Sequence, residues 1–144
     1  MRETLKIRLT HKNAVIPTRG HPDDAGLDLT ITGIVTDLSP CVTLYDTGIA
    51  VQPPEGFYTQ VVARSSTSKL GISLASGTGI IDPSFRGSIK LAIRFHEALI
   101  SRESLIGRRI GQLLIKPLHI MEVEEVDSLD DSIRGAGGFG STGE

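Results

Sequence analysis

Short stretches in which apolar and polar residues alternate run along most of the chain. In segment 5–9 three aliphatic residues are separated by Lys6 and Arg8, and segment 27–31 repeats the pattern. A period of two residues is typical of β-strands that bury one face. Further strands are predicted at Cys41–Val51, Phe57–Ala63, Gly87–Phe95, Ile110–Ile115 and His119–Val126.

Turn-forming residues interrupt these runs at close intervals, as at Pro53–Gly56 and Asp82-Pro83. Only Ser66–Leu70 and Glu97–Leu105 have a pattern compatible with a helix, and neither carries a long apolar stripe. Many short strands at close spacing favour an all-β fold, an antiparallel β-barrel or distorted jelly roll with at most one or two short helices.

Composition narrows the class of protein. A length of 144 residues suits one domain, and only 4% of the residues are aromatic, so the core must rest on Ile, Leu and Val. A net charge of −2 provides no basic field for a nucleic-acid partner. No apolar run approaches the roughly 20 residues of a membrane span, and Cys41 has no partner for an internal disulfide. An intracellular, soluble protein is expected.

The end of the chain differs from the rest. After the acidic stretch Glu124–Asp131, the last eleven residues contain five glycines and one large side chain, Phe139. Such a segment buries too little apolar surface to offset its ordering entropy. We therefore expect a β-domain over residues 1–126, followed by an acidic linker and flexible arm over residues 127–144.

Two interpretations of the arm remain open. Glycine-rich ends are most often frayed termini. However, Arg134, Phe139, Ser141 and Thr142 supply a cation, a stacking ring and two hydroxyls, which suit a phosphorylated nucleotide. Residues 135–140 match GxGxxG, but no helix can follow them, and Ser141 stands where a P-loop would have lysine. These residues therefore support only the weaker inference of a loop whose backbone groups bind an anion.

Four internal segments carry candidate chemistry. Segment Asp24–Leu29 is either a turn that enters a strand or part of a site in which the Asp28 carboxylate is functional. Arg64-Ser65-Ser66 follows a strand and is either an anion site or an N-cap with a surface arginine. Arg109–Gln112 sets a cation and an amide near another strand start.

The fourth segment, Gly77–Gly87, is the most informative. Its first two glycines permit close approach of the backbone to a flat ligand. Asp82, between Ile81 and Phe85, is suited to act as a general base on water, although an Asp-Pro turn cap is the common alternative.

Taken in order with the arm, these segments resemble the five motifs of the trimeric dUTP pyrophosphatases (dUTPases), over Asp24–Gly143. The resemblance implies a homotrimer of β-barrel subunits with sites at subunit interfaces. It also implies Mg²⁺-assisted hydrolysis of dUTP to dUMP and pyrophosphate, which keeps uracil out of DNA and supplies dUMP for dTMP synthesis.

The resemblance assigns a role to individual residues. Asp82 would activate the water that attacks the α-phosphorus, Phe85 would exclude a 2′-hydroxyl, and Asp28 would act on Mg²⁺ through water. The uracil edge would be read in a hairpin by backbone groups of Gly77, Ile80, Ile81 and Lys90. The phosphates would be held by Arg64, Ser65, Ser66 and Gln112. The arm would close a neighbouring subunit's site with Arg134, Phe139, Gly140, Ser141 and Thr142.

Two departures from the family pattern bear on alternatives. Phe85 stands where many dUTPases have Tyr. Ser66 replaces a glycine, and this second change favours a resemblance to the dCTP deaminases, which have the same fold. Deamination needs a glutamate five residues beyond Gly87, and that position is Ala92. The alternatives are therefore a deaminase, a bifunctional deaminase–dUTPase, or a non-catalytic nucleotide-binding homologue.

Overall fold

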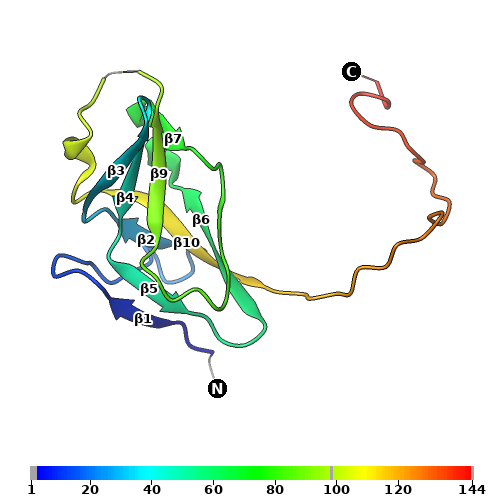
Figure 1. Ribbon diagram of the computed structural model, residues 1–144, viewed down its shortest axis with the longest axis horizontal. Helices are drawn as coiled ribbons and strands as arrows, with labels where there is room; N and C mark the ends of the chain where they lie inside the picture. Colours follow the sequence, from blue (N-terminus) through cyan, green and yellow to red (C-terminus); the bar gives the residue numbers. More distant parts are fainter. Residues whose placement is uncertain (1–2, 98, 144) are drawn as a thin grey trace.

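The computed structural model describes residues 3–97 and 99–143 and is all-β, as predicted (Figure 1). Within the described residues, the predicted helical segments contain only the 3-10 helices η1 and η2. The elements are β1 (Lys6–Leu9), β2 (Leu27–Thr30), β3 (Gly33–Ser39), β4 (Val42–Asp46), β5 (Ile49–Gln52), β6 (Phe57–Ala63), η1 (Ser65–Leu70), β7 (Ile72–Leu74), β8 (Gly79–Ile81), β9 (Lys90–Phe95), η2 (Glu103–Leu105) and β10 (Arg109–Pro117).

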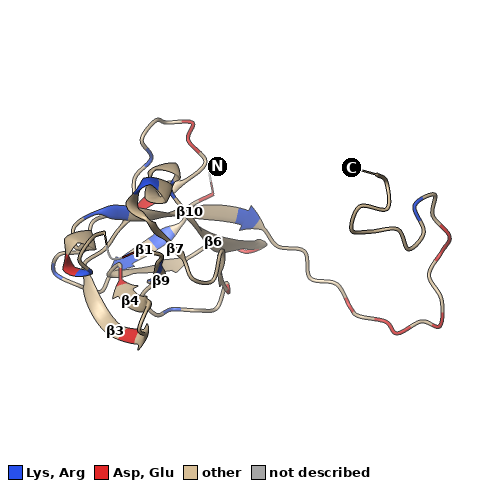
Figure 2. Cartoon of the chain, turned by 90° about the horizontal axis from the view of Figure 1, so that it is seen from above, with Lys and Arg blue, Asp and Glu red and all other residues tan. Residues whose placement is uncertain are grey.

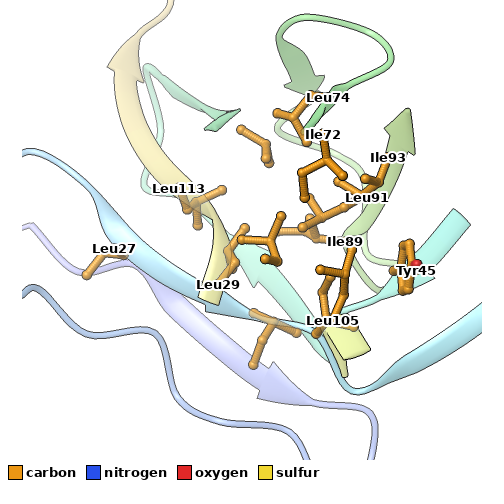
Figure 3. Packing of buried hydrophobic residues seen from close by; sticks show 14 of the residues in the cluster. Leu27, Leu29, Tyr45, Ile72, Leu74, Ile89, Leu91, Ile93, Leu105 and Leu113 are labelled. Atoms are coloured by element: carbon orange, nitrogen blue, oxygen red, sulfur yellow. The ribbon is translucent and has the colours of Figure 1, made fainter. Parts of the chain in front are cut away.

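The strands form antiparallel sheets that face one another across an aliphatic core. One sheet has the order β2-β10-β6-β8, the second has the order β3-β4-β9-β7, and β1 pairs with β5. Leu29, Ile89 and Leu113 are fully buried between them (Figure 3). Because strand side chains alternate between faces, every second residue of β2 enters this core, and the residues between remain available for a site.

Buried polar groups tie the loops to this core. The Tyr45 hydroxyl donates to the carbonyl oxygen of Arg102 at 2.9 Å. Burial raises the pKa of Tyr45 to about 12, so this phenol stays neutral at physiological pH. The hydroxyl of Thr43 and the guanidinium of Arg102 both donate to Asp37, and they hold the pKa of that carboxyl below its usual range.

Several predicted strand boundaries needed correction. Phe57–Ala63 is a strand as predicted, but Cys41–Val51 is broken into β4 and β5. The break is at Gly48, whose φ of +67° favours glycine and turns the chain into another sheet. Strand β3 was missed because it is an exposed edge strand without alternation, and β7 and β8 have only three residues each.

The predicted strand at His119–Val126 was wrong, because these residues are extended and pair with no strand in the part of the chain that the structure describes. They begin an arm that leaves the barrel after β10 and extends far from it (Figure 1). The side chain of Val123 is 99% exposed. Acidic residues follow one another along the first part of the arm (Figure 2). In the ranges that the structure describes, no helix is long and apolar enough to span a membrane.

Candidate active site

A polar pocket of about 280 Å³ brings together three of the segments singled out in the sequence. Strand β10 lies between β2 and β6, so Gln112 is paired with Asp28 on one side and with Val62 on the other. Arg64 follows the end of β6, beside this pair. The pocket, called the phosphate pocket below, is lined by Gly20, Asp24, Ala25, Gly26, Asp28, Arg64, Ser65, Arg109 and Gln112.

Asp28 organises the charges of the phosphate pocket. Its Oδ1 forms an ion pair with the Nε of Arg64 at 2.8 Å, and its Oδ2 accepts from the Nη1 of Arg109 at 3.0 Å. Its side chain is only 14% exposed, which strengthens both ion pairs relative to pairs in open solvent. Asp28 orients two guanidiniums and compensates one of their two charges, and Asp24 brings a second carboxylate to the pocket.

Gln112 is fixed by a close approach of the backbone. Its Nε2 donates to the carbonyl oxygen of Ala63 at 3.1 Å. A Cβ added to Gly26 would lie 2.0 Å from its Oε1, so the amide occupies space that only glycine leaves open. This close contact is the physical reason for the glycine in the Ala25-Gly26-Leu27 segment.

Asp82 lies in a separate, wider pocket of about 690 Å³. Its carbonyl oxygen accepts from the N–H of Phe85 at 3.0 Å, which closes a tight turn. Arg86 Nη1 donates to the carbonyl oxygens of Pro83, at 2.5 Å, and Phe85, at 3.1 Å. The pocket is lined by Tyr58, Ile80, Asp82, Pro83, Ser84, Pro117, Leu118, His119 and Ile120.

The ring of Phe85 packs over Gly87. A Cβ at Gly87 would lie 2.5 Å from the Cζ of that ring, so a larger residue at this position would displace the ring. The Phe85 side chain is still 44% exposed, which leaves its outer face available for a ligand.

The strands on either side of the Asp82 turn do not form the predicted hairpin with one another. Strand β8 pairs with β6, whereas β9 lies between β4 and β7 in the other sheet. Each has an edge without a strand partner in the described part of the chain. Strand β8 is the last of its sheet, and β7 with the following Ala75 covers β9 only as far as Ala92. Unpaired edges expose backbone donors and acceptors, next to Ile80 and Ile81 on β8 and to Lys90 on β9. Gly77, with φ +71°, turns the chain into β8, and its N–H donates to Leu74.

The two pockets lie at opposite ends of β6. Asp82 is beside Tyr58, because Ile81 pairs with Thr59, while Arg64 follows the other end of the strand. Tyr58 and Arg64 are six residues apart on an extended strand, a separation of about 20 Å. The predicted base and the predicted phosphate ligands of one chain are therefore not brought together.

Residues 134–143 of the arm line neither pocket. The hydrogen bonds of residues 134–143 join neighbouring arm residues, such as that from the Nε of Arg134 to the carbonyl oxygen of Gly137 at 2.7 Å. Phe139 is fully exposed and has a φ of +47°, while Gly140 has a φ of +85°. Ser141 and Thr142 are also exposed.

Three residues gain a role that the sequence patterns did not give them. Arg109 is the second cation on Asp28, Arg86 braces the turn that carries Asp82, and Tyr58 lines the Asp82 pocket. The Arg109–Gln112 pattern located a cation at a strand start, but the pairing with Asp28 depends on strand order. Ser66 lies outside the phosphate pocket and lines an adjoining one.

Comparison with known proteins identifies the family. A family model described as dUTPase matches residues 12–143 of the chain. The chain belongs to the dUTPase family. It is 38% identical over 143 residues to the deoxyuridine 5′-triphosphate nucleotidohydrolase of Corynebacterium jeikeium, covering 96% of this chain and 92% of that protein. Its identity to the Nocardia farcinica protein is 40% over 129 residues, covering 89% of this chain and 78% of that protein.

Solved dUTPase structures share the fold. A mutant of the Staphylococcus bacteriophage 80alpha dUTPase, solved with dUpNHpp, superposes with a TM-score of 0.84 at 27% identity, covering 98% of this chain and 99% of that one. A mutant dUTPase of phage phi11 of S. aureus, described with a structural Mg(II) ion, superposes with a TM-score of 0.74 at 25% identity. It covers 89% of this chain and 99% of that one.

The deaminase alternative lacks its proton shuttle in this dUTPase. Ala92 lies on β9 opposite Leu44, and its methyl group cannot transfer a proton. Glu97, the carboxylate that follows along the chain, lies beyond the end of β9 at Phe95.

Proposed function

We propose that this dUTPase hydrolyses dUTP to dUMP and pyrophosphate in sites that are completed by a second copy of the chain. The observation that carries the proposal is the separation of about 20 Å along β6 between Asp82 and the phosphate pocket. Reacting atoms must lie about 3–3.5 Å apart, so one chain cannot hold the phosphates and activate water on the same substrate.

A second copy resolves this separation. Its Asp82 pocket would meet the phosphate pocket of the first copy, an interface between two different surfaces. Interfaces of that kind close into a ring when the rotation permits. The family resemblance gives the ring three copies. In such a ring every subunit supplies its Asp82 pocket to one site and its phosphate pocket to another.

The free edges of β8 and β9 support recognition of uracil by backbone groups. Ile80, Ile81 and Lys90, with the turn at Gly77, would pair with the donor and acceptor edge of the base. Cytosine presents a different pattern at two positions and would leave buried groups unpaired. Such mismatches discriminate by about 10⁴-fold.

Phe85 would contact the deoxyribose. Its exposed ring face is backed by Gly87, so the ring cannot retreat from an added 2′-hydroxyl. The missing phenolic oxygen of a tyrosine does not alter this steric role. UTP is therefore expected to be a poor substrate.

Asp82 would act as the general base. Its carboxylate would take a proton from the water that attacks the α-phosphorus, and pyrophosphate would leave with the electrons of the broken P–O bond. The braced turn at Pro83 and Phe85 would hold the carboxylate at a fixed distance from that water. On this basis, the aspartate is more than an Asp-Pro turn cap.

The phosphate pocket would hold the triphosphate through Arg64, Ser65 and Gln112, with Ser66 at its border. Its donor set fits Mg²⁺ only indirectly. In the described residues no cluster of three metal-ligating side chains exists, and each oxygen of Asp28 already forms an ion pair with an arginine. Mg²⁺ commonly keeps its waters and binds substrate phosphates, so Asp28 would accept hydrogen bonds from those waters. The ion would supply neutralisation of phosphate charge.

The arm would close the site of a neighbouring copy. Phe139 and Gly140 would cover the uracil, and Arg134, Ser141 and Thr142 would approach the phosphates, which excludes bulk water. The acidic linker from residue 127 would give this arm its reach. The apolar residues of the uncovered segment at His119–Val126 would be buried only against another copy.

Release of pyrophosphate from four nucleotides tests the proposed reaction. With Mg²⁺, dUTP should be cleaved at least about 10³-fold faster than dCTP, dTTP or UTP, since each analogue leaves a buried group unpaired or collides with the site. Ammonia release from dCTP would establish the deaminase instead. Equal turnover of UTP would contradict the steric role of Phe85.

A further inference from the structure

A second cationic pocket adjoins the phosphate pocket. It has a volume of about 310 Å³ and shares Arg64 and Arg109 with the phosphate pocket. Its remaining lining residues are Ser66, Leu70, Gly107 and Arg108. Three guanidiniums therefore surround one small space that opens beside the proposed phosphate ligands.

The charge of this second pocket is not balanced. The phosphate pocket is lined by Asp24 and Asp28, whereas no carboxylate among the described residues lines the second one. Asp28 compensates one of the two charges of Arg64 and Arg109. Arg108 makes no ion pair and no side-chain hydrogen bond with any residue that the structure describes. Positive charges that line one pocket repel one another, so an anion bound between them would be favoured.

The backbone at Arg108 is held firmly in place. The carbonyl oxygen of Ile31 accepts from Gly107 N–H at 2.8 Å, and Ile31 N–H donates to the carbonyl oxygen of Arg108 at 3.0 Å. Arg108 N–H in turn donates to the carbonyl oxygen of Leu105 at 3.0 Å, next to the buried Leu105 side chain. The exposed guanidinium thus extends from a fixed point, and its position beside Arg109 does not depend on a mobile loop.

We propose that Arg108, with Arg64 and Arg109, forms a second anion subsite that holds a terminal diphosphate group. The inference rests on the proposed function, because a triphosphate held in the phosphate pocket would extend its terminal phosphates into the adjoining pocket. The shared chemistry belongs to free pyrophosphate and to the β- and γ-phosphates of the bound nucleotide. The nucleoside monophosphate lacks this group and does not reach the subsite.

Titration calorimetry with inorganic pyrophosphate tests the subsite on the full-length protein. Arg108→Gln should weaken pyrophosphate binding about tenfold, the loss expected for one hydrogen bond to a charged group. Binding of dUpNHpp should weaken by a similar factor, and binding of dUMP should be unchanged. Arg108→Lys keeps the charge but not the planar fork, so it should restore part of the affinity.

The control is Arg94→Gln, which removes the same charge from β9, away from both pockets. It should leave pyrophosphate binding unchanged. Unaltered pyrophosphate affinity in Arg108→Gln would overturn the subsite, as would an equal loss in Arg94→Gln or an equal loss for dUMP. Pyrophosphate binding requires no turnover. If dUTP were not hydrolysed, the proposed function would fail while a specific loss in Arg108→Gln would still support the subsite.

Discussion

Replacement of Asp82 by asparagine should lower kcat for dUTP by about 10²–10⁴-fold, the usual contribution of a positioned general base. The amide keeps the shape of the side chain and the Phe85 N–H bond to the Asp82 carbonyl, so the turn should persist. Affinity for dUpNHpp should therefore stay within about twofold of the unaltered protein, because the phosphate ligands lie in another pocket. Single-turnover kinetics and calorimetry measure the two quantities separately.

Glu55→Gln provides the matched control. It makes the same carboxylate-to-amide change at an exposed turn outside both pockets, and its activity should equal that of the unaltered protein. Full activity in Asp82→Asn would show that another group activates the water. Loss of dUpNHpp binding in the same variant would show that Asp82 serves binding instead of chemistry.

Removal of residues 134–144 should lower kcat/KM for dUTP by about 10²-fold, because the substrate would lose its cover and its alignment. The melting temperature should hardly change. The hydrogen bonds of the described arm residues are internal to the arm, and Phe139 is fully exposed, so the barrel loses no packing. A steady-state assay and a thermal melt on the same sample check both expectations.

Phe139→Ala separates stacking from the other roles of the arm. It should reproduce part of the kinetic loss, while Ile133→Ala, an exposed apolar residue that precedes the arm's cation, should have no effect. An arm deletion with unaltered kcat/KM would support the frayed-terminus interpretation. A large drop in melting temperature would mean that the arm stabilises the assembly.

Local patterns predicted much of the fold. The all-β class and the strand at Phe57–Ala63 follow from alternation and turn residues, and the short helical segment predicted at Ser66–Leu70 is a 3-10 helix at Ser65–Leu70. Strand partners did not follow, because sequence alternation does not reveal which edges pair. The resemblance implied a hairpin of Gly77–Gly87 with the strand that follows, whereas β9 pairs with β4 and β7. The predicted strand at His119–Val126 has the right alternation but no partner within the described part of the chain.

The residues of the candidate site were likewise predicted from local patterns, but their relations to one another were not. Asp28, Arg64, Ser65 and Gln112 were chosen from motif patterns, and strand order brings them into one pocket. The role of Arg109 at Asp28 depends on the pairing of β2 with β10, which no local pattern reveals. The separation of Asp82 from the phosphate pocket likewise follows from the length and direction of β6.

Mixing two inactive variants tests the shared site most directly. Asp82→Asn and Arg64→Gln each remove one contribution to every site when present alone. If Asp82 and Arg64 act from different copies, co-expressed chains should form intact sites at about a quarter of positions in randomly mixed rings. We predict recovery of about that fraction of dUTP turnover. Mixed assemblies that remain as inactive as the separate variants would contradict the account, since both residues would then act within one chain.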